Sequence, residues 1–296
     1  MIIPIVFSTD ENYVLPLSVA LKSVINSKAK YDELDVYVFY SKLSKESQNL
    51  ILRVAGNGAK VTFTCVDEYV KGVYLYEKGN LTVATYYRFF APIILSNYKK
   101  ILYLDCDIIV KNSLAEFYSI DMGDNIIAGP KFIHQTGELL NYFNAGVIAI
   151  NVEEYNKNNV CQKSLDYINA HRNLEWLDET VLNKICKGKV KFIHHKFNFQ
   201  TTYAKEKRNL EVTQVKSIKD IVIIHYTEKP WKFVNTILAD YWWKTVKTMP
   251  KEIQNKIDEK FSANYIYDVD FVYYKYYFAN PIKKFFIKLK KKIFKK

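Results

Sequence analysis

KKILYLDCDIIV, residues 99–110, combines a strongly apolar run with two closely spaced carboxylates. The run ILYL is hydrophobic at every position, which is typical of a strand buried on both faces of a parallel sheet. It leads directly into Asp105-Cys106-Asp107. We therefore predict a strand over 99–110 in an α/β sheet, with both carboxylates at the carboxyl end of its apolar part, where ligands of such sheets gather.

Other short apolar runs alternate with amphipathic segments along the chain. Residues 16–27 repeat apolar side chains at helical spacing. The alternation of strands and helices predicts an α/β fold with a mainly parallel sheet and right-handed crossovers. Further strands are expected at 2–10, 34–41, 59–66, 125–130, 145–151 and 220–227, and further helices at 44–55, 152–171 and 177–188.

The chain is long and apolar enough to bury a large core. It has 296 residues, of which 49% are hydrophobic, so global disorder is excluded. The four cysteines form no CxxC pair and no zinc-ligand spacing, which suits a reducing cytoplasm. The apolar N-terminus lacks a cationic leader region, so we interpret it as a buried strand rather than a signal peptide. No run of 18 apolar residues predicts a membrane-spanning helix.

The positive charge is concentrated at the C-terminus. The formal net charge is +12, but residues 281–296, PIKKFFIKLKKKIFKK, contain eight lysines and no acid, which leaves +4 for the rest. A cationic helix with an apolar face favours an anionic membrane surface, with a solvated tail or a helix docked on the body as alternatives. Nucleic acid is not expected as a partner, because that apolar face would gain little from phosphates. The apolar face consists of Ile282, Phe285, Phe286, Leu289 and Ile293.

Asp105 and Asp107 are candidate metal ligands. Two carboxylates one residue apart at the end of a strand can bridge Mn²⁺ or Mg²⁺, and such a cation stabilises a diphosphate as it leaves. The alternative is a pair of acids that caps the next helix.

His225 is a third candidate ligand, within DIVIIHYTEKPW (220–231). A neutral imidazole could complete the metal site, and Lys229 could hold a phosphate as a point charge. A single histidine after a strand is otherwise commonly structural. The chain has no GxGxxG or Walker loop, so backbone amides alone would not hold a diphosphate.

The segment FSTDENY (7–13) follows the first predicted strand. Polar side chains at that turn, Asp10 and Asn12 among them, could contact a base and a ribose. The alternative is that Thr9 or Asp10 only caps the following helix.

Seven short segments, taken in their order along the chain, resemble those of glycosyltransferase family 8. This is the family of bacterial lipopolysaccharide galactosyl- and glucosyltransferases and of glycogenin. The resemblance spans about residues 2–232 and implies a single Rossmann-like nucleotide-sugar domain of the GT-A type. It implies Mn²⁺-dependent transfer of galactose or glucose from a UDP-sugar to a saccharide, with retention of configuration. The segments are FSTDENY, TYYRFF, ILYLDCDIIV, FNAGVIAIN, LDETVLN, FNF and HYTEKPW.

The resemblance also implies a role for individual positions. Metal ligands are implied at Asp105, Asp107 and His225, with Cys106 between the two carboxylates; uridine contacts at Ser8, Asp10 and Asn12; a donor contact at Arg88; the sugar pocket at Asn144 and Ala145; sugar hydroxyl binding at Asp178; and the diphosphate lysine at Lys229.

Two features depart from the family pattern. Glu179 stands where the family usually has Gln, and we consider three roles for it: a nucleophile, an electrostatic stabiliser of positive charge on the sugar, or none. Only three residues separate His225 from Lys229, a shorter loop than is usual, and Glu228 would repel a diphosphate unless it points away.

Two other function classes compete with the glycosyltransferase. One is an aspartate-nucleophile phosphatase, whose strand also ends in Asp-x-Asp but lies early in the chain; the other is a non-catalytic nucleotide-sugar or membrane-binding module. We predict a catalytic domain at 1–249 and a C-terminal extension at 250–296 that includes the basic tail at 281–296. The expected partners are a UDP-sugar, a saccharide or glycolipid acceptor and an anionic membrane. The expected location is the inner face of the cytoplasmic membrane.

Overall fold

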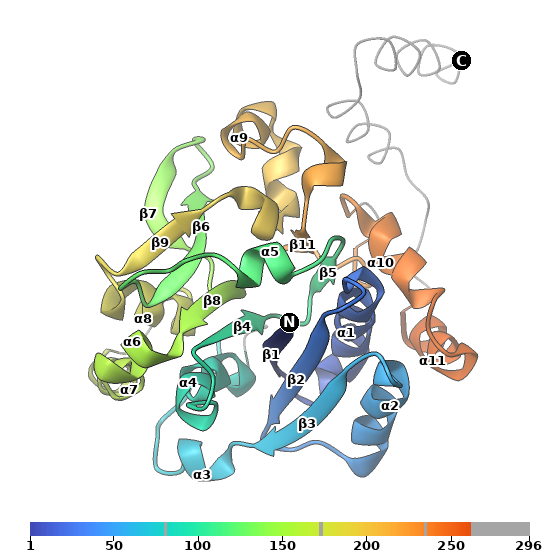
Figure 1. Cartoon of the computed structure of the whole chain (residues 1–296), viewed down its shortest axis with the longest axis horizontal. Helices are drawn as coiled ribbons and strands as arrows, with labels where there is room; N and C mark the ends of the chain where they lie inside the picture. The colour runs from blue at the N-terminus through green and yellow to red at the C-terminus, as the bar shows by residue number, and fades with distance from the viewer. Residues whose placement is uncertain (80–81, 172–173, 234–235, 262–296) are drawn as a thin grey trace.

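The computed structural model describes residues 1–79, 82–171, 174–233 and 236–261 (Figure 1). An eight-stranded sheet lies at its centre, in the order β3-β2-β1-β4-β8-β6-β7, with β9 paired to β6. The strands are β1 (Ile2–Ser8), β2 (Glu33–Tyr40), β3 (Lys60–Cys65), β4 (Lys100–Leu104), β6 (Ile127–Ile133), β7 (Leu139–Phe143), β8 (Val147–Asn151) and β9 (Val190–Ile193).

The first half of the large sheet is parallel. Strand β1 pairs in parallel with β2 and β4, and β2 pairs in parallel with β3. Strand β8 is antiparallel to both β4 and β6, whereas β9 is parallel to β6. The predicted α/β fold with a mainly parallel sheet is therefore confirmed.

A second sheet of three strands joins β10 (Phe199–Gln200), β11 (Ile223–His225) and β5 (Ile108–Val110). The prediction of one strand over 99–110 was wrong, because β4 ends at Leu104 and β5 starts at Ile108 in the other sheet. Leu104 pairs with Val147 of β8, while Ile108 pairs with His225 of β11. Asp105, Cys106 and Asp107 thus form the corner between the two sheets.

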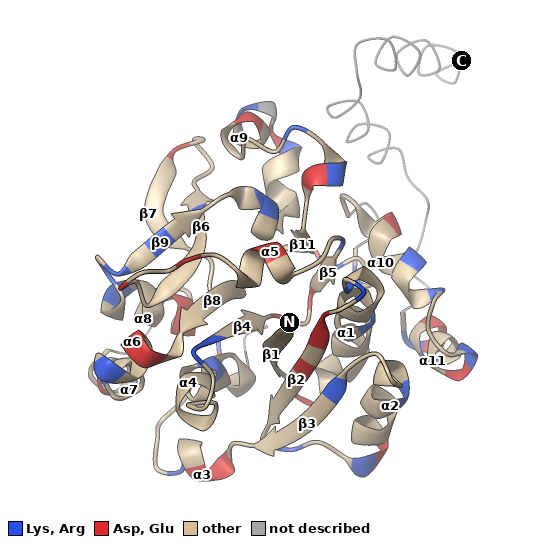
Figure 2. Cartoon of the chain, in the orientation of Figure 1, with Lys and Arg blue, Asp and Glu red and all other residues tan. Residues whose placement is uncertain are grey.

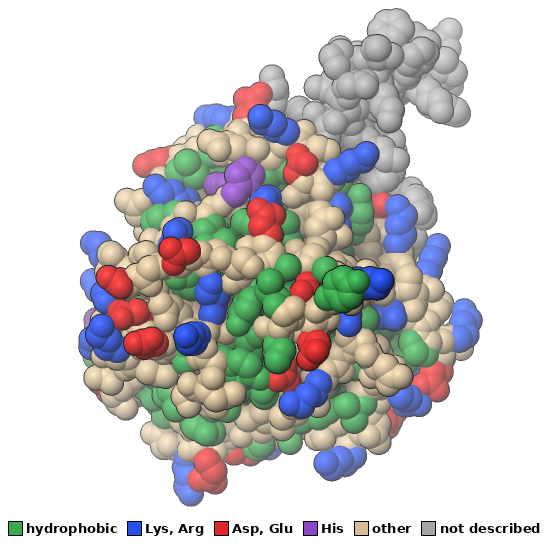
Figure 3. Space-filling view, in the orientation of Figure 1, with side chains coloured by type: hydrophobic (Ala, Val, Ile, Leu, Met, Phe, Trp, Pro, Cys, Tyr) green, Lys and Arg blue, Asp and Glu red, His purple; other side chains and the backbone are tan. Residues whose placement is uncertain are grey.

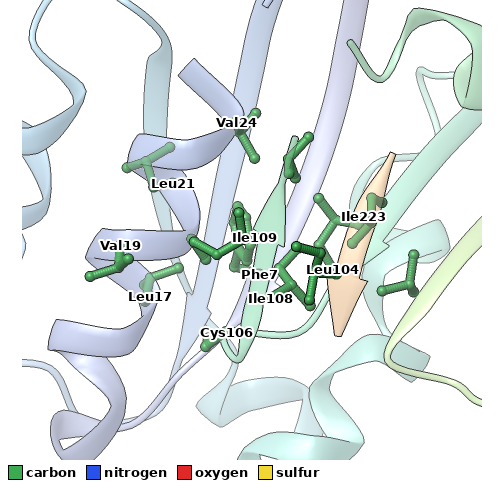
Figure 4. Packing of buried hydrophobic residues seen from close by; sticks show 14 of the residues in the cluster. Phe7, Leu17, Val19, Leu21, Val24, Leu104, Cys106, Ile108, Ile109 and Ile223 are labelled. Atoms are coloured by element: carbon green, nitrogen blue, oxygen red, sulfur yellow. The ribbon is translucent and has the colours of Figure 1, made fainter. Parts of the chain in front are cut away.

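Both faces of the central strands of the large sheet are buried, as the continuous apolar runs predicted. On β4, Leu102 and Leu104 belong to one core cluster, and Ile101 and Tyr103 belong to another. This alternation is the two-residue period of a strand. Figure 4 shows part of the first cluster, which includes Leu17 and Leu21 of helix α1 (Val14–Ser27).

The longer helices cover the two sheets (Figure 1). Helix α2 starts after Ser44, whose side chain accepts a hydrogen bond from the Ser47 N–H. The predicted helix over 152–171 is broken in two, because Asn159 adopts a left-handed backbone with φ +52°. The longer helices are α2 (Lys45–Ala55), α6 (Val152–Lys157), α7 (Val160–Ala170), α8 (Leu177–Ile185), α10 (Ala239–Val246) and α11 (Lys251–Phe261).

Short helical segments fill the connections. They are α3 (Asp67–Val70), α4 (Ala91–Ile94), α5 (Ala115–Tyr118), α9 (Lys207–Val212) and the 3-10 turns Glu11–Tyr13, Val83–Phe89, His195–Phe197, Thr201–Lys205 and Ile218–Asp220.

Helix α11 lies within the predicted C-terminal extension, yet it packs on the body. Its Ile253 and Ile257 are buried in the core cluster that contains α1, so this core continues beyond residue 249. The basic tail at 281–296 lies outside the described residues. Figure 2 shows basic and acidic residues interspersed along the outer helices, and Figure 3 shows their side chains interspersed over the face in view. Within the described ranges, every helix is too short or too polar to cross a membrane.

Candidate active site

Three candidate ligands converge where the two sheets meet. Asp105 and Asp107 flank the corner, and the antiparallel register of β5 and β11 sets His225 beside Ile108, next to Asp107. One ligand atom from each lies within 4.8 Å of the others. The His225 Nε2 atom is 3.2 Å from Asp107 Oδ1 and 4.0 Å from Asp105 Oδ2. The structure therefore brings together the three residues expected to bind metal.

Two further features fit a cation at this place. Within the described part of the chain, no donor makes a hydrogen bond to the buried Asp107 Oδ1. Gly146 supplies the space: a Cβ there would meet Asp105 Oδ2, and it would lie 2.6 Å from His225 Cε1. Two carboxylates are suitable ligands for Mn²⁺ or Mg²⁺, and the imidazole nitrogen fits a transition metal such as Mn²⁺ better than Mg²⁺.

Arg88 connects this site to helix α8. Its guanidinium is buried and lies 3.0 Å from Asp105 Oδ1 through Nη2 and 2.9 Å from Asp178 Oδ2 through Nε. Nη1 donates to the Ala145 carbonyl, and the guanidinium stacks 4.2 Å above the Tyr103 ring. The resemblance implied that Arg88 contacts the donor. In this structure Arg88 lines the cavity and also holds both acids in place.

Asp178 is held on the first turn of α8. Leu177, just before it, has a left-handed φ of +41°, a strained conformation for a leucine. This turn directs the buried Asp178 carboxylate to Arg88 and to the Thr85 hydroxyl, which donates to it. Burial raises the pKa of Asp178 to about 6, against the opposing charge of Arg88.

Glu179 supports the segment that carries Asn144 and Ala145. Its Oε2 accepts hydrogen bonds from Asn144 Nδ2 at 2.7 Å and from the Ala145 N–H at 3.0 Å. Burial raises the pKa of Glu179 to about 8, so the side chain is largely a neutral carboxylic acid at pH 7. A protonated carboxyl that already accepts two hydrogen bonds is a poor nucleophile.

The short loop after His225 still brings Lys229 to the site. Its ammonium forms an ion pair with Asp107 Oδ2 and donates to the Tyr226 carbonyl at 2.8 Å. Glu228 points elsewhere, to an ion pair with Lys205. Burial alone would raise the pKa of Asp107, but the nearby positive charge of Lys229 holds it below its usual range.

The segment after β1 shows the capping role that was considered for it. Asp10 Oδ1 accepts hydrogen bonds from the N–H groups of Asn12 and Tyr13, so Asp10 caps a 3-10 turn. Its Oδ2 accepts from the Thr82 hydroxyl at 3.0 Å. The Cys106 thiol donates to the Ser8 carbonyl at 3.2 Å and is buried (Figure 4). It is therefore a core side chain between the two carboxylates.

A cavity of about 590 Å³ lies over these residues. Six of the described site residues do not line the cavity, although several of them contact residues that do. They are Asn12, Asn144, Ala145, Asp178, Glu179 and His225.

Two groups near the cavity were not predicted from the sequence. Trp176, 54% exposed, stands at the cavity beside Glu175, and buried Asn198 contacts His225. Asn198 lies in the quoted segment FNF, to which no role was given. The predicted residues that line the cavity are Ser8, Asp10, Arg88, Asp105, Cys106, Asp107 and Lys229.

Comparison with known families gives a clear result. The family model "Glycosyl transferase family 8" matches residues 4–235, most of the chain. The chain belongs to glycosyltransferase family 8. This glycosyltransferase is 32% identical to a putative glycosyltransferase of Haemophilus influenzae over 75% of this chain and 70% of that protein. Family membership thereby sets aside the phosphatase and the non-catalytic module.

Three further matches are glycosyltransferases or structures of them. The lipopolysaccharide 1,3-galactosyltransferase of Salmonella typhimurium is 26% identical over 77% of this glycosyltransferase and 72% of that protein. The crystal structure of an active-site mutant of LgtC superimposes with a TM-score of 0.72 at 25% identity, over 86% of this chain and all of that one. The chain spans 60% of the length of glycosyltransferase GlyB of Streptococcus pneumoniae.

Gly146→Ala is expected to abolish glycosyl transfer and divalent-cation binding. The new Cβ would meet Asp105 Oδ2 and lie 2.6 Å from His225 Cε1, so both ligands must move. Gly129→Ala is the matched control, because its Cβ would meet Ile148 at an ordinary 3.5 Å. Isothermal titration with Mn²⁺ and a transfer assay measure both effects. Normal cation binding by Gly146→Ala would contradict this geometry.

Glu179→Gln is expected to change how stability depends on pH. The pKa of Glu179 is raised to about 8 in the folded protein, whereas an unperturbed Glu has a pKa of about 4.3. The unfolded chain therefore loses this proton first, and the wild-type free energy of unfolding should fall relative to Glu179→Gln as pH rises from about 4 to about 8. Above that range the difference should stay constant. Urea unfolding between pH 5 and pH 9 measures it. Glu153→Gln, at an exposed site on α6, is the control, and its free energy of unfolding should depend on pH as that of the wild type does. If the free energies of wild type and Glu179→Gln changed with pH in parallel, the raised pKa of Glu179 would be refuted.

Proposed function

We propose that this glycosyltransferase moves a hexose, galactose or glucose, from a UDP-sugar to a saccharide of a cell-surface glycan, with Mn²⁺ or Mg²⁺ and with retention of configuration. The observation that carries the proposal is the convergence of Asp105, Asp107 and His225 under a cavity that also holds Lys229. A lipopolysaccharide galactosyltransferase among the relatives supports the hexose and the acceptor class.

The cation would be held by the carboxylates of Asp105 and Asp107 and by the His225 imidazole. It would supply positive charge against the diphosphate of the leaving UDP. Lys229 lies at the same carboxylate, so its ammonium is placed to move from Asp107 to a phosphate oxygen when the donor enters. The ion pair between Glu228 and Lys205 keeps the Glu228 charge away from that diphosphate.

The donor would lie across the cavity from the turn after β1 to helix α8. Ser8 and Asp10 line the end assigned to uridine, with Asn12 exposed beside them. Arg88 lines the end assigned to the sugar, and Asp178, buried behind it, would accept hydrogen bonds from sugar hydroxyls when the donor displaces one of its present partners, Arg88 or Thr85. Glu179 would act there by holding Asn144 and the Ala145 backbone rather than by attacking the sugar. Retention would then follow from attack on the same face of the donor that the leaving group departs from.

The acceptor side and the location form a second part of the proposal. Exposed Trp176, at the cavity, is a flat apolar surface of the kind that packs against a sugar ring. The basic residues 281–296 would bring the enzyme to an anionic membrane on the cytoplasmic side, where a glycolipid acceptor is available.

A screen of UDP-sugars tests the donor and the metal requirement together. Wild-type protein with Mn²⁺ should hydrolyse UDP-galactose or UDP-glucose slowly without an acceptor and should lose this activity in excess chelator. Asp107→Ala should lose most turnover, because the uncompensated charge on the leaving group costs several kcal/mol. Asp166→Ala, at an exposed position on α7 that bonds only Gln162 in the described hydrogen-bond network, is the matched control. Full wild-type turnover in chelator would exclude the metal requirement.

Removal of the tail tests the proposed location. A chain that ends at Asn280 should keep its turnover on a soluble acceptor and lose binding to anionic vesicles, because eight lysines and the apolar face are removed together. Salt should weaken vesicle binding of the full chain only in part, since the apolar face contributes independently. Co-sedimentation with vesicles of phosphatidylglycerol, compared with phosphatidylcholine, measures binding. Equal sedimentation of both chains would reject a role for the tail.

A further inference from the structure

A continuous line of hydrogen bonds runs from helix α8 to the candidate metal site. Glu179 Oε2 accepts from Asn144 Nδ2, and Asn144 Oδ1 accepts from Asn198 Nδ2 at 3.1 Å. Asn198 Oδ1 lies 3.0 Å from His225 Nδ1. The opposite ring nitrogen of His225 faces Asp107. Two side-chain amides thus link the Glu179 carboxyl to a candidate metal ligand.

Two backbone N–H groups fix the direction of every bond in this line. The Ala145 N–H donates to Glu179 Oε2, which is therefore an acceptor, so the Asn144 group that faces it must be the NH₂. The Gly146 N–H donates to Asn144 Oδ1 at 3.2 Å, which confirms that this atom is the oxygen. If the Asn144 amide were flipped, its oxygen would face Glu179 Oε2 and its NH₂ would face the Gly146 N–H, so neither hydrogen bond could form.

The orientation of Asn144 also fixes the orientation of Asn198 and the tautomer of His225. Because Asn144 presents an oxygen, Asn198 must present its NH₂ to Asn144 and its oxygen to His225. That oxygen requires a proton on His225 Nδ1. The Nε2 lone pair is then the one available to a cation, and Nε2 faces the Asp107 Oδ1 that has no hydrogen bond among the described residues. A bare nitrogen and a bare carboxylate oxygen 3.2 Å apart favour a cation beside both.

We propose that Asn198 is a positioning residue that holds His225 in the form with a proton on Nδ1, so that Nε2 is free to bind the metal, and that ties this ligand to the sugar-pocket segment at Asn144. The proposal rests on the metal site of the proposed function. Outer hydrogen bonds of this kind commonly set the orientation and basicity of metal-binding histidines, although the partner is usually a carboxylate or a carbonyl rather than an amide.

The surroundings of Asn198 keep it in this position. Its side chain is 2% exposed, and its backbone N–H donates to the His195 carbonyl. Phe197 stacks on Phe117 with ring centroids 5.2 Å apart, and Phe199 on β10 pairs with Ile224 of β11. The segment FNF therefore anchors two aromatic rings in the core and directs the amide between them toward His225.

At position 198 an amide can hydrogen-bond to both neighbours, because its NH₂ donates to Asn144 Oδ1 and its oxygen accepts from His225 Nδ1. A carboxylate could accept from His225 Nδ1, but it would face Asn144 Oδ1 with a second acceptor. Alanine would lose both bonds and leave the histidine free to adopt either tautomer. Asn198→Asp and Asn198→Ala therefore separate the two halves of the proposed role.

The tautomer can be measured without any metal. Long-range ¹H–¹⁵N correlation spectra of protein labelled in histidine show which ring nitrogen carries the proton, and the His225 signals are identified by their loss in His225→Gln. At pH 8, wild-type His225 should carry its proton on Nδ1, and Asn198→Asp should keep it there. Asn198→Ala should show both tautomers. A wild-type signal with the proton on Nε2 alone would overturn the proposal, and folded His225→Gln is needed only to assign that signal.

Mn²⁺ titration of the folded proteins supplies the second measurement. Asn198→Ala should raise the dissociation constant for Mn²⁺ by about 10–100-fold, and Asn198→Asp should stay much closer to the wild type. Asn112→Ala is the matched control, because it also loses two side-chain hydrogen bonds, to the carbonyls of Lys219 and Ile221 near the start of β11. Its Mn²⁺ affinity should not change.

The outcomes distinguish the two proposals. If wild-type protein binds no Mn²⁺, the metal site of the proposed function fails, while the tautomer still tests the hydrogen-bond line. If wild-type protein binds Mn²⁺ and folded Asn198→Ala binds it equally well, Asn198 has no positioning role.

Discussion

The buried guanidinium of Arg88 is the interaction on which the arrangement of the site depends. It lies between Asp105 at the sheet corner and Asp178 on helix α8, and it also bonds the Ala145 carbonyl. Removing this cation would leave the Asp178 carboxylate buried without its charge partner, which is strongly unfavourable. Arg88 therefore fixes the distance between the part of the site that holds the cation and the part assigned to the sugar.

The position of the Asp-Cys-Asp corner follows from a change of sheet. Strand β4 ends in the large sheet and β5 begins in the small one, so the chain must turn at Asp105–Asp107. The central thiol of Cys106 packs inward, and the two flanking carboxylates point to the cavity side. Because β11 pairs antiparallel with β5, which begins directly after this corner, His225 arrives beside Asp107 through strand register rather than through a nearby loop.

The two departures from the family pattern, Glu179 and the short loop before Lys229, are both explained by local hydrogen bonds and ion pairs. Glu179 in place of Gln keeps an acceptor toward Asn144 and Ala145, and burial holds it largely neutral, so an acid does the work of an amide. The short loop between His225 and Lys229 does not withdraw the lysine, because the Tyr226 carbonyl and Asp107 both hold its ammonium. Lys205, from a distant 3-10 turn, balances Glu228.

The sequence alone determined the fold class, the family and the carboxylates of the site. Short apolar runs such as ILYL, alternating with amphipathic segments, are typical of buried strands, and ordered short segments such as HYTEKPW carry a family pattern that needs no coordinates. Tertiary structure decided where β4 ends, where the helix over 152–171 breaks, and that Asn198 serves His225. Those outcomes depend on strand pairing and on the direction of hydrogen bonds between residues far apart in the chain. Local periodicity contains no information about either, because a side-chain amide has the same sequence signature whether it faces water or a buried histidine.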